Sequence, residues 1–164
     1  MNRFCKAVFL LLTCALLAAC GWHLKGQHIN PPIPHKIYLT SFDSYGETHL
    51  LLKKTLQRQN ALSPTLADSD YHLEILNEDI ETNTLSISDI NNASEYEIVL
   101  SINYQINPKN GELARKQNLK TGRHYQFNRN RVVAKEREQK KLLEEMRNDL
   151  INQLVRQLGY LPAN

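Results

Sequence analysis

The alternation of apolar and polar side chains is clearest between residues 96 and 106. Apolar residues occupy every second position there, and mostly polar residues fill the positions between them. A period of two is typical of a β-strand with one buried and one hydrated face, and such strands usually belong to antiparallel sheets covered on one side. We therefore predict a long strand whose buried face consists of Tyr96, Ile98, Leu100, Ile102, Tyr104 and Ile106.

Three other segments predict further strands. Residues 71–87 begin with strict alternation and then lose it, which indicates a long strand that is irregular or exposed at its far end. Residues 108–111 read Pro-Lys-Asn-Gly, and because Asn-Gly tolerates the positive φ angles of a type I′ turn, we predict a hairpin into a fourth strand at 113–127. A short β-rich run at residues 37–40 predicts the first strand.

A helix is predicted between the first two strands. Ser44 and Glu47 have the spacing of a capping box, in which two side chains satisfy backbone N–H groups at a helix start. The helix should run to about Gln59, with Leu52 and Leu56 as its buried stripe.

A second, longer helix is predicted at residues 134–158, because apolar residues recur there every three or four positions and Gly159 and Pro162 follow as stop signals. The element order is then β-α-β-β-β-α. This order predicts a long, narrow α+β domain with an antiparallel or mixed four-stranded sheet and both helices packed on one face, which leaves the other face and the edges for a partner. The apolar stripe of the helix is Leu143, Met146, Leu150 and Leu154, flanked by Ile151, Val155 and Leu158.

The N-terminus is typical of an export signal. Two basic residues precede an apolar run at 7–17, which is too short for a stable transmembrane helix, and small residues follow it. Residues 17–20, Leu-Ala-Ala-Cys, resemble a bacterial lipobox, which predicts cleavage before Cys20 and acylation of this cysteine as a membrane anchor. Gly21, in place of an aspartate, resembles lipoproteins sorted to the Gram-negative outer membrane, on its periplasmic side.

These signals divide the chain into four parts. We predict a lipoprotein signal peptide at residues 1–19, and then the acylated cysteine with an extended, proline-containing tether at 20–35. A single α+β domain follows at 36–160, and a short C-terminal tail occupies 161–164.

The composition argues against several classes of protein. A chain of 164 residues with 41% hydrophobic residues can bury one ordinary core. Its net charge of +3 falls to +1 without the two basic residues of the signal peptide, which argues against a nucleic-acid-binding protein. All three cysteines lie in the first twenty positions, the six histidines lack metal-ligand spacing, and no P-loop, G-x-G-x-x-G or G-x-S-x-G motif occurs. We therefore predict a protein that is not an enzyme and has no cofactor or metal.

Charge is segregated along the chain. Residues 60–108 contain nine acidic residues and no Lys or Arg, whereas residues 109–137 contain nine basic residues and two acidic ones. Two interpretations stay open: adjacent strands of opposite sign pair across the sheet, or the basic cluster Arg129, Arg131 and Lys135 binds a phosphorylated partner. For an outer-membrane lipoprotein, the phosphate-rich ligand at hand is lipopolysaccharide.

Three stretches of the chain resemble a known family. They are the predicted mature N-terminus at 20–26, Cys-Gly-Trp-His-Leu-Lys-Gly; the start of the long strand at 93–96, Ala-Ser-Glu-Tyr; and the late helix, with Glu-Gln at 138–139 and Glu-Met at 145–146. Together with the order of elements, they resemble the LptE family of lipopolysaccharide-assembly lipoproteins over nearly the whole mature chain.

The resemblance implies a domain that plugs the LptD β-barrel, assists its folding, and contacts lipopolysaccharide on its way to the cell surface. Family members carry a basic residue in the turn between the second and third strands, whereas residues 88–92 here read Ser-Asp-Ile-Asn-Asn. Lys135 matches a family basic position and favours a plug that contacts lipopolysaccharide. Asp89 favours the alternative, a purely structural assembly factor for the barrel with no lipopolysaccharide contact.

Overall fold

The computed structural model describes residues 31–86, 94–111, 113–127 and 132–162. The four strands form one open, mixed sheet in the order β1-β2-β3-β4, in which β1 and β2 are parallel and the other neighbours are antiparallel. The predicted fold class and element order are confirmed. The elements are β1 (Ile37–Ser41), α2 (Glu47–Arg58), β2 (Tyr71–Ser86), β3 (Ser94–Pro108), β4 (Arg115–Phe127) and α3 (Val132–Gly159).

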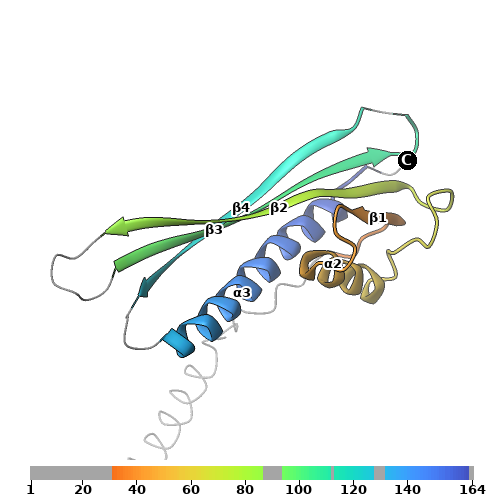
Figure 1. Ribbon diagram of the computed structural model, residues 1–164. Helices are drawn as coiled ribbons and strands as arrows, with labels where there is room; N and C mark the ends of the chain where they lie inside the picture. Colours follow the sequence, from red (N-terminus) through yellow and green to blue (C-terminus); the bar gives the residue numbers. More distant parts are fainter. Residues whose placement is uncertain (1–30, 87–93, 112, 128–131, 163–164) are drawn as a thin grey trace, which may run out of the picture.

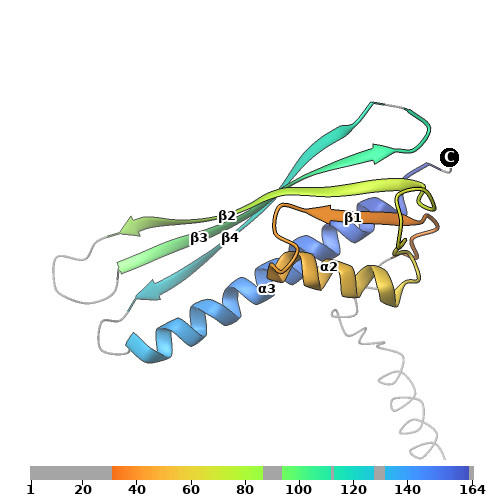
Figure 2. The ribbon, with the colours of Figure 1, turned by 45° about the vertical axis from the view of Figure 1, so that its right-hand side comes forward.

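Both helices lie on one face of the sheet (Figure 1, Figure 2). Helix α3 runs under β3 and β4, and α2 lies beside α3 near β1. Strand β3 has 15 residues and α3 has 28. At about 3.4 Å per strand residue and 1.5 Å per helix residue, they span roughly 50 Å and 42 Å, so the domain is long and narrow, as predicted.

The core lies between the helices and the part of the sheet that includes β1. The predicted apolar stripe of α2 is confirmed, since Leu52 and Leu56 are fully buried. The predicted stripe of α3 is buried from Met146 onward, while Leu143 is only partly buried. Alternate residues of the strands close the core from the other side, among them Leu73, Ile75, Ile98, Leu100, Ile102 and Tyr104.

The described residues that precede β1 pack against the domain. Ile33 belongs to the core, and the His35 ring is buried and makes a T-shaped contact with the ring of Tyr71, with centroids 5.2 Å apart. Nε2 of His35 lies 2.9 Å from the carbonyl oxygen of Leu161, just beyond the end of α3. The last residues of the stretch predicted to be a tether therefore contact the end of the domain where α3 finishes.

Helix α2 begins at Glu47, with Gly46 as the N-cap and no side-chain capping hydrogen bond. Asp43 forms a turn ahead of the helix: its carboxylate accepts the N–H of Tyr45 at 2.9 Å, and its carbonyl oxygen accepts the N–H of Gly46 at 3.4 Å. This turn leaves Ser44 outside the helix, so the predicted capping box is wrong.

The connection from β3 to β4 is longer than the predicted two-residue turn. The last residue pair between these strands is Ile106 with Arg115. Gly111 has a φ of +81°, but Asn110 has no positive φ, and a type I′ turn requires both. The predicted hairpin between these strands is confirmed, but its type I′ turn is wrong, because β3 continues to Pro108 by pairing with β2 before the chain turns into β4.

The far end of β2 is irregular and exposed, as its pattern predicted. Near that end, its register against β3 shifts between Thr84 and Ser86; another shift lies in its first half, between Ile75 and Asn77. Ile80 remains 46% exposed although it lies on the helix side of the sheet. Neither β1 nor α2 covers it, since both elements lie nearer the other end of the sheet (Figure 2).

Candidate interaction surface

The residues predicted to bind lipid or lipopolysaccharide lie at the limits of the described chain. Cys20, Arg129 and Arg131 fall outside the described residues, as does Asp89. Lys135 belongs to the first turn of α3, and its side chain is outside the described ones. The roles of these residues stay predictions.

The sheet face that points away from the helices, which we call the outer face, is polar. It carries the residues that alternate with the buried ones along each strand. An Asn118–Asn103 hydrogen bond of 2.7 Å joins β4 to β3 on this face, and Thr40 lies 2.7 Å from Nε2 of His72 between β1 and β2. On β3 the outer face consists of Glu97, Val99, Ser101, Asn103, Gln105 and Asn107.

Two rows of side chains cross the outer face with the same order of charge. Each row has an acidic residue on β2, an uncharged residue on β3 and a lysine on β4. A shift of register in β2 places both acids on this face, because they are five positions apart and would point to opposite faces in a regular strand. The rows are Glu74–Gln105–Lys116 and Asp79–Ser101–Lys120.

The acidic residues of the two rows form a charged band along β2, and the lysines form one along β4. These two charged bands do not neutralise each other. Strands β2 and β4 are separated by β3, so their backbones lie about 10 Å apart, which is comparable to the Debye length at physiological salt. No described carboxylate lies within ion-pair distance of Lys116 or Lys120. The interpretation that neighbouring strands of opposite sign pair across the sheet is therefore wrong for these residues.

One pair between a basic and an acidic side chain does join β3 to β4. Nε2 of His124 lies 3.8 Å from Oε1 of Glu97, and the His124 side chain is 72% exposed. The Glu97 carboxylate leans over Gly122, where a Cβ atom would lie only 2.8 Å from Oε1. Gly122, on the basic strand β4, thus leaves space for the carboxylate of Glu97 on the neighbouring strand β3.

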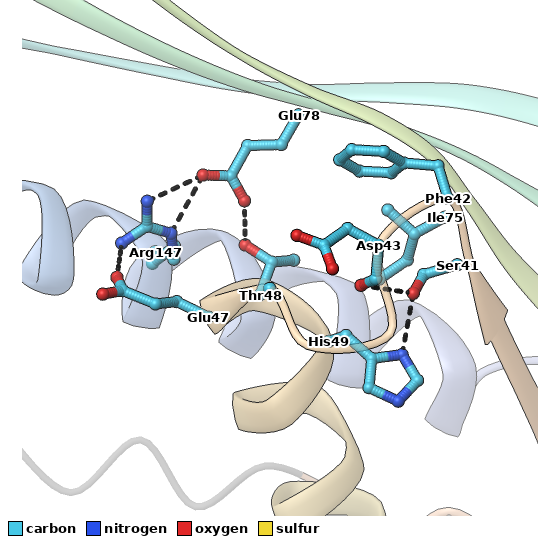
Figure 3. Close-up of a pocket in the computed structure, with 10 residues that line it drawn as sticks. Ser41, Phe42, Asp43, Glu47, Thr48, His49, Ile75, Glu78 and Arg147 are labelled. Carbon is cyan, nitrogen blue, oxygen red and sulfur yellow. Dashed lines mark hydrogen bonds and ion pairs between the residues drawn. The ribbon is translucent and has the colours of Figure 1, made fainter.

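An ionic cluster around the nearly buried Arg147, which was not predicted from the sequence, joins β2, α2 and α3 (Figure 3). The side chain of Arg147 is 11% exposed, and its Nη2 and Nε donate to Oε1 of Glu78 at 2.7 and 3.0 Å. Its Nη1 pairs with Glu47, and the Thr48 hydroxyl donates to the second oxygen of Glu78. The available signal was a charged residue within the apolar stripe of α3, four positions before Ile151.

A pocket of about 250 Å³ opens beside this cluster. Ser41, His49 and Asp43 line it and are residue types of a hydrolase triad, but their hydrogen bonds run in the wrong direction for catalysis. The Ser41 hydroxyl donates to the carbonyl oxygen of Asp43 at 2.8 Å, so it accepts a hydrogen from Nδ1 of His49 at 2.9 Å. Burial lowers the pKa of His49, the nearby Lys53 lowers it further, and Asp43 opposes the shift. These groups therefore hold the start of α2 in place.

Within the described ranges, no group of three or more His, Cys, Asp or Glu side chains could hold a metal ion. In the part of the chain that the structure describes, no helix is both long enough and apolar enough to cross a membrane.

The model of the family LptE, Lipopolysaccharide-assembly, matches residues 35–158, from the buried His35 to the end of the core stripe of α3. The chain belongs to the LptE family. It is 28% identical over 156 residues to the LPS-assembly lipoprotein LptE of Photorhabdus laumondii, covering 93% of this chain and 85% of that protein. It is 30% identical over 161 residues to the LptE of Yersinia enterocolitica, covering 93% and 75%.

Solved structures share the fold of this LptE-family chain. Rare lipoprotein B of Shewanella oneidensis superimposes with a TM-score of 0.69 at 24% identity, covering 75% of this chain and 92% of that one. An uncharacterized lipoprotein B of Nitrosomonas europaea gives a TM-score of 0.67 at 22% identity, covering 85% and 90%. At these identities the likeness supports the two-layer architecture.

Proposed function

We propose that this LptE-family chain is an outer-membrane lipoprotein, anchored through Cys20, that plugs an LptD-like β-barrel and helps it to assemble. In this role it takes part in the transport of lipopolysaccharide to the outer-membrane surface. The observation that carries the proposal is a long, narrow domain of this family whose sheet has one polar, uncovered face.

The shape suits the lumen of a wide barrel. Four strands at about 4.8 Å spacing make a sheet roughly 19 Å across, against a length of about 50 Å. Barrel interiors are polar, and the largest barrels have plugged lumens. A domain with a polar outer face can fill such a space without burying unpaired charge against hydrocarbon.

The anchor would attach at a defined end of the domain. The segment before β1 contacts the end of α3 through His35 and Ile33. Ten residues lie between Cys20 and Pro31. The eleven steps from one Cα atom to the next reach at most roughly 40 Å, at about 3.6 Å per step. Several acyl chains on Cys20 would hold the protein firmly, since each buried methylene contributes about 0.8 kcal/mol.

The lipopolysaccharide contact would lie at the opposite end. Arg129, Arg131 and Lys135 belong to the connection between β4 and α3 and to the first turn of that helix. Charge-assisted hydrogen bonds to phosphate are stronger than neutral ones, and each contributes about 1.5 to 3 kcal/mol. The structural assembly factor without this contact is the second candidate, favoured by Asp89 in the β2–β3 connection.

Depletion and co-purification test the barrel role. Full-length tagged protein, extracted from outer membranes in detergent, should bring the LptD barrel with it, and its depletion should lower the amount of correctly assembled barrel. Recovery of the protein alone, with normal barrel assembly in its absence, would contradict both candidates. The Cys20→Ala variant behind a soluble-type signal should be released into the periplasm as folded protein and take up no labelled fatty acid, whereas the wild type should be labelled.

Charge removal separates the two candidates. Replacing Arg129, Arg131 and Lys135 by Ala should abolish most lipopolysaccharide binding while the barrel still assembles. The matched control removes three basic residues from α2, at Lys53, Lys54 and Arg58, which are exposed. Equal lipopolysaccharide affinity in the triple variant, the control and the wild type would leave the structural assembly factor.

A further inference from the structure

The charge bands of the outer face specify more about the partner than its shape does. We propose that the outer face is the surface covered by the inner wall of the barrel, with acidic groups of the wall over β4 and basic groups over β2. The inference rests on the proposed plug function. The inference specifies which face of the domain contacts the barrel, and which distribution of charge on that face would set the orientation of the domain.

The charged side chains of the two rows are available to a partner. Asp79, Lys116 and Lys120 are exposed and Glu74 is half-buried. Asp79 accepts a hydrogen bond of 2.8 Å from the neighbouring Asn77, which leaves its negative charge in place. No ion pair within the described residues uses any of these four groups.

The lysines on β4 and the acidic Asp79 on β2 lie along open edges of the sheet, whereas Glu74 lies where β2 pairs with β1 through Thr40. Strand β1 pairs with β2 only as far as Ile75, so the outer edge of β2 beyond Asn77 is next to no described strand. The outer edge of β4 likewise has no described strand beside it over Arg115–Phe127. Charged side chains at such edges oppose pairing with unrelated strands, so a partner must match their charge to come close.

A protein wall with acidic groups over β4 and basic groups over β2 would complement both charged bands. A phosphate-bearing lipid or a second copy of this chain fits the face less well. Lipid or glycolipid phosphates would be attracted by β4 and repelled by β2, so they would use half of the face. A second copy could match the bands only by rotation about an axis parallel to the strands, and the face offers it little apolar surface, since Val99 on β3 is only 5% exposed. A polar lumen wall needs no apolar patch, and complementary charge would set the orientation of the domain within it.

The test reverses the two rows without changing the net charge. The row-reversed variant combines Glu74→Lys, Asp79→Lys, Lys116→Glu and Lys120→Asp in the full-length protein. The matched control exchanges an exposed pair on the helix layer, with Lys141→Glu and Glu145→Lys; this pair has side chains 77% and 62% exposed. Circular dichroism and thermal unfolding should show that both variants fold as the wild type does.

We expect the barrel recovered with the row-reversed variant to fall about tenfold, since several exposed charge contacts of up to roughly 1 kcal/mol each become repulsive. The control should recover as much barrel as the wild type. Equal recovery with all three proteins would overturn the inference and leave the plug function standing. Failure of the wild type itself to recover the barrel would instead contradict the proposed function.

Two further results would show that the outer face binds a second copy of the chain or a glycolipid instead of the barrel wall. Reversal keeps the face complementary to its own copy, so a dimer seen by ultracentrifugation for both wild type and variant, with barrel recovery unchanged, would assign the face to self-association. Lys116→Gln with Lys120→Gln tests the phosphate route: loss of binding to vesicles containing lipopolysaccharide, with full barrel recovery, would assign the face to the glycolipid. Either result would overturn the inference.

Discussion

The two ends of the sheet are stabilised in different ways. In the half that contains β1 and α2, the side chains of Leu56, Leu73 and Leu150 are completely buried between two layers. In the other half, Ile80 and Leu85 on β2 remain 46% and 47% exposed. One end of this small domain thus carries the core, and the other end extends long strands beyond it (Figure 1).

The difference follows from the lengths of the elements. Strand β1 has 5 residues and α2 has 12, so both end before the far half of the sheet, where α3 alone continues beneath the strands. Aromatic packing partly replaces the missing layer, since the rings of Tyr96 and Tyr125 stack with centroids 5.5 Å apart. Because it buries so little apolar surface, this half of the sheet should open locally at a lower free-energy cost than the half that contains the core.

Truncation of a core leucine should show the contrast most strongly. Leu150→Ala leaves a cavity among fully buried side chains and should lower the free energy of unfolding by about 4 kcal/mol. Ile80→Ala lies in the half of the sheet without β1 and α2, which we call the open half. This change should lower the free energy of unfolding by less than about 1 kcal/mol, because the side chain is already partly hydrated. Urea unfolding of the two purified variants measures both values, and similar losses would show that the halves are equally packed.

Removing the buried arginine should have the next largest effect. Arg147→Ala leaves the nearly buried Glu78 without its partner and should cost about 3 kcal/mol in the free energy of unfolding. The double change Arg147→Met with Glu78→Met removes both charges and should restore stability to within about 1 kcal/mol of the wild type. A double variant as unstable as Arg147→Ala would show that the cluster stabilises the junction of β2, α2 and α3 through more than charge pairing.

Titration of Tyr104 and Tyr125 should distinguish the two halves of the sheet at high pH. Burial raises the pKa of Tyr104 to about 12 from 10.0. Its stabilising effect is therefore complete below pH 10 and is lost as the pH rises toward 12, because the unfolded chain ionises first. The melting temperature should fall over this range, and Tyr104→Phe should reduce the fall. Tyr125, whose pKa is raised first by its partial burial and then by Tyr96, lies in the open half, and Tyr125→Phe should change the fall less.

The smallest effect is expected in acid, at the start of α2. Because burial lowers the pKa of His49 below 6.5, the folded protein favours the neutral ring. The resulting stability is present above pH 6.5 and is lost as the pH falls through the lowered pKa. His49→Gln should flatten this part of the stability curve, while Gln57→Ala, an exposed change on the same helix that removes no titratable group, should leave it unchanged. An identical acid slope in both variants would assign the loss to other groups.

Much of the fold could be predicted from the chain because it depends on local periodicity. The alternation around Leu100 and the three-to-four spacing around Leu154 each indicate which side chains must leave water, whatever their partners are. The two wrong local predictions concern turns. Ser44 is not the N-cap of α2, because a turn at Asp43 precedes the helix. Asn110 does not form a type I′ turn, because β3 continues to pair with β2 as far as Pro108. Contacts with neighbouring elements decided both.

By itself, the sequence determined the element order, the buried stripes, the export and lipobox signals, and the segregation of charge, all of which depend on residues close together in the chain. The tertiary structure alone decided where those charges lie. In strict alternation with Ile75, Glu78 would point outward and Asp79 inward, but the register shift after Ile75 reverses both. Glu78 thereby reaches Arg147, 69 positions away, and Asp79 joins the row that ends at Lys120. Such pairings depend on strand register and helix placement, which the packing of the whole core fixes and no local pattern encodes.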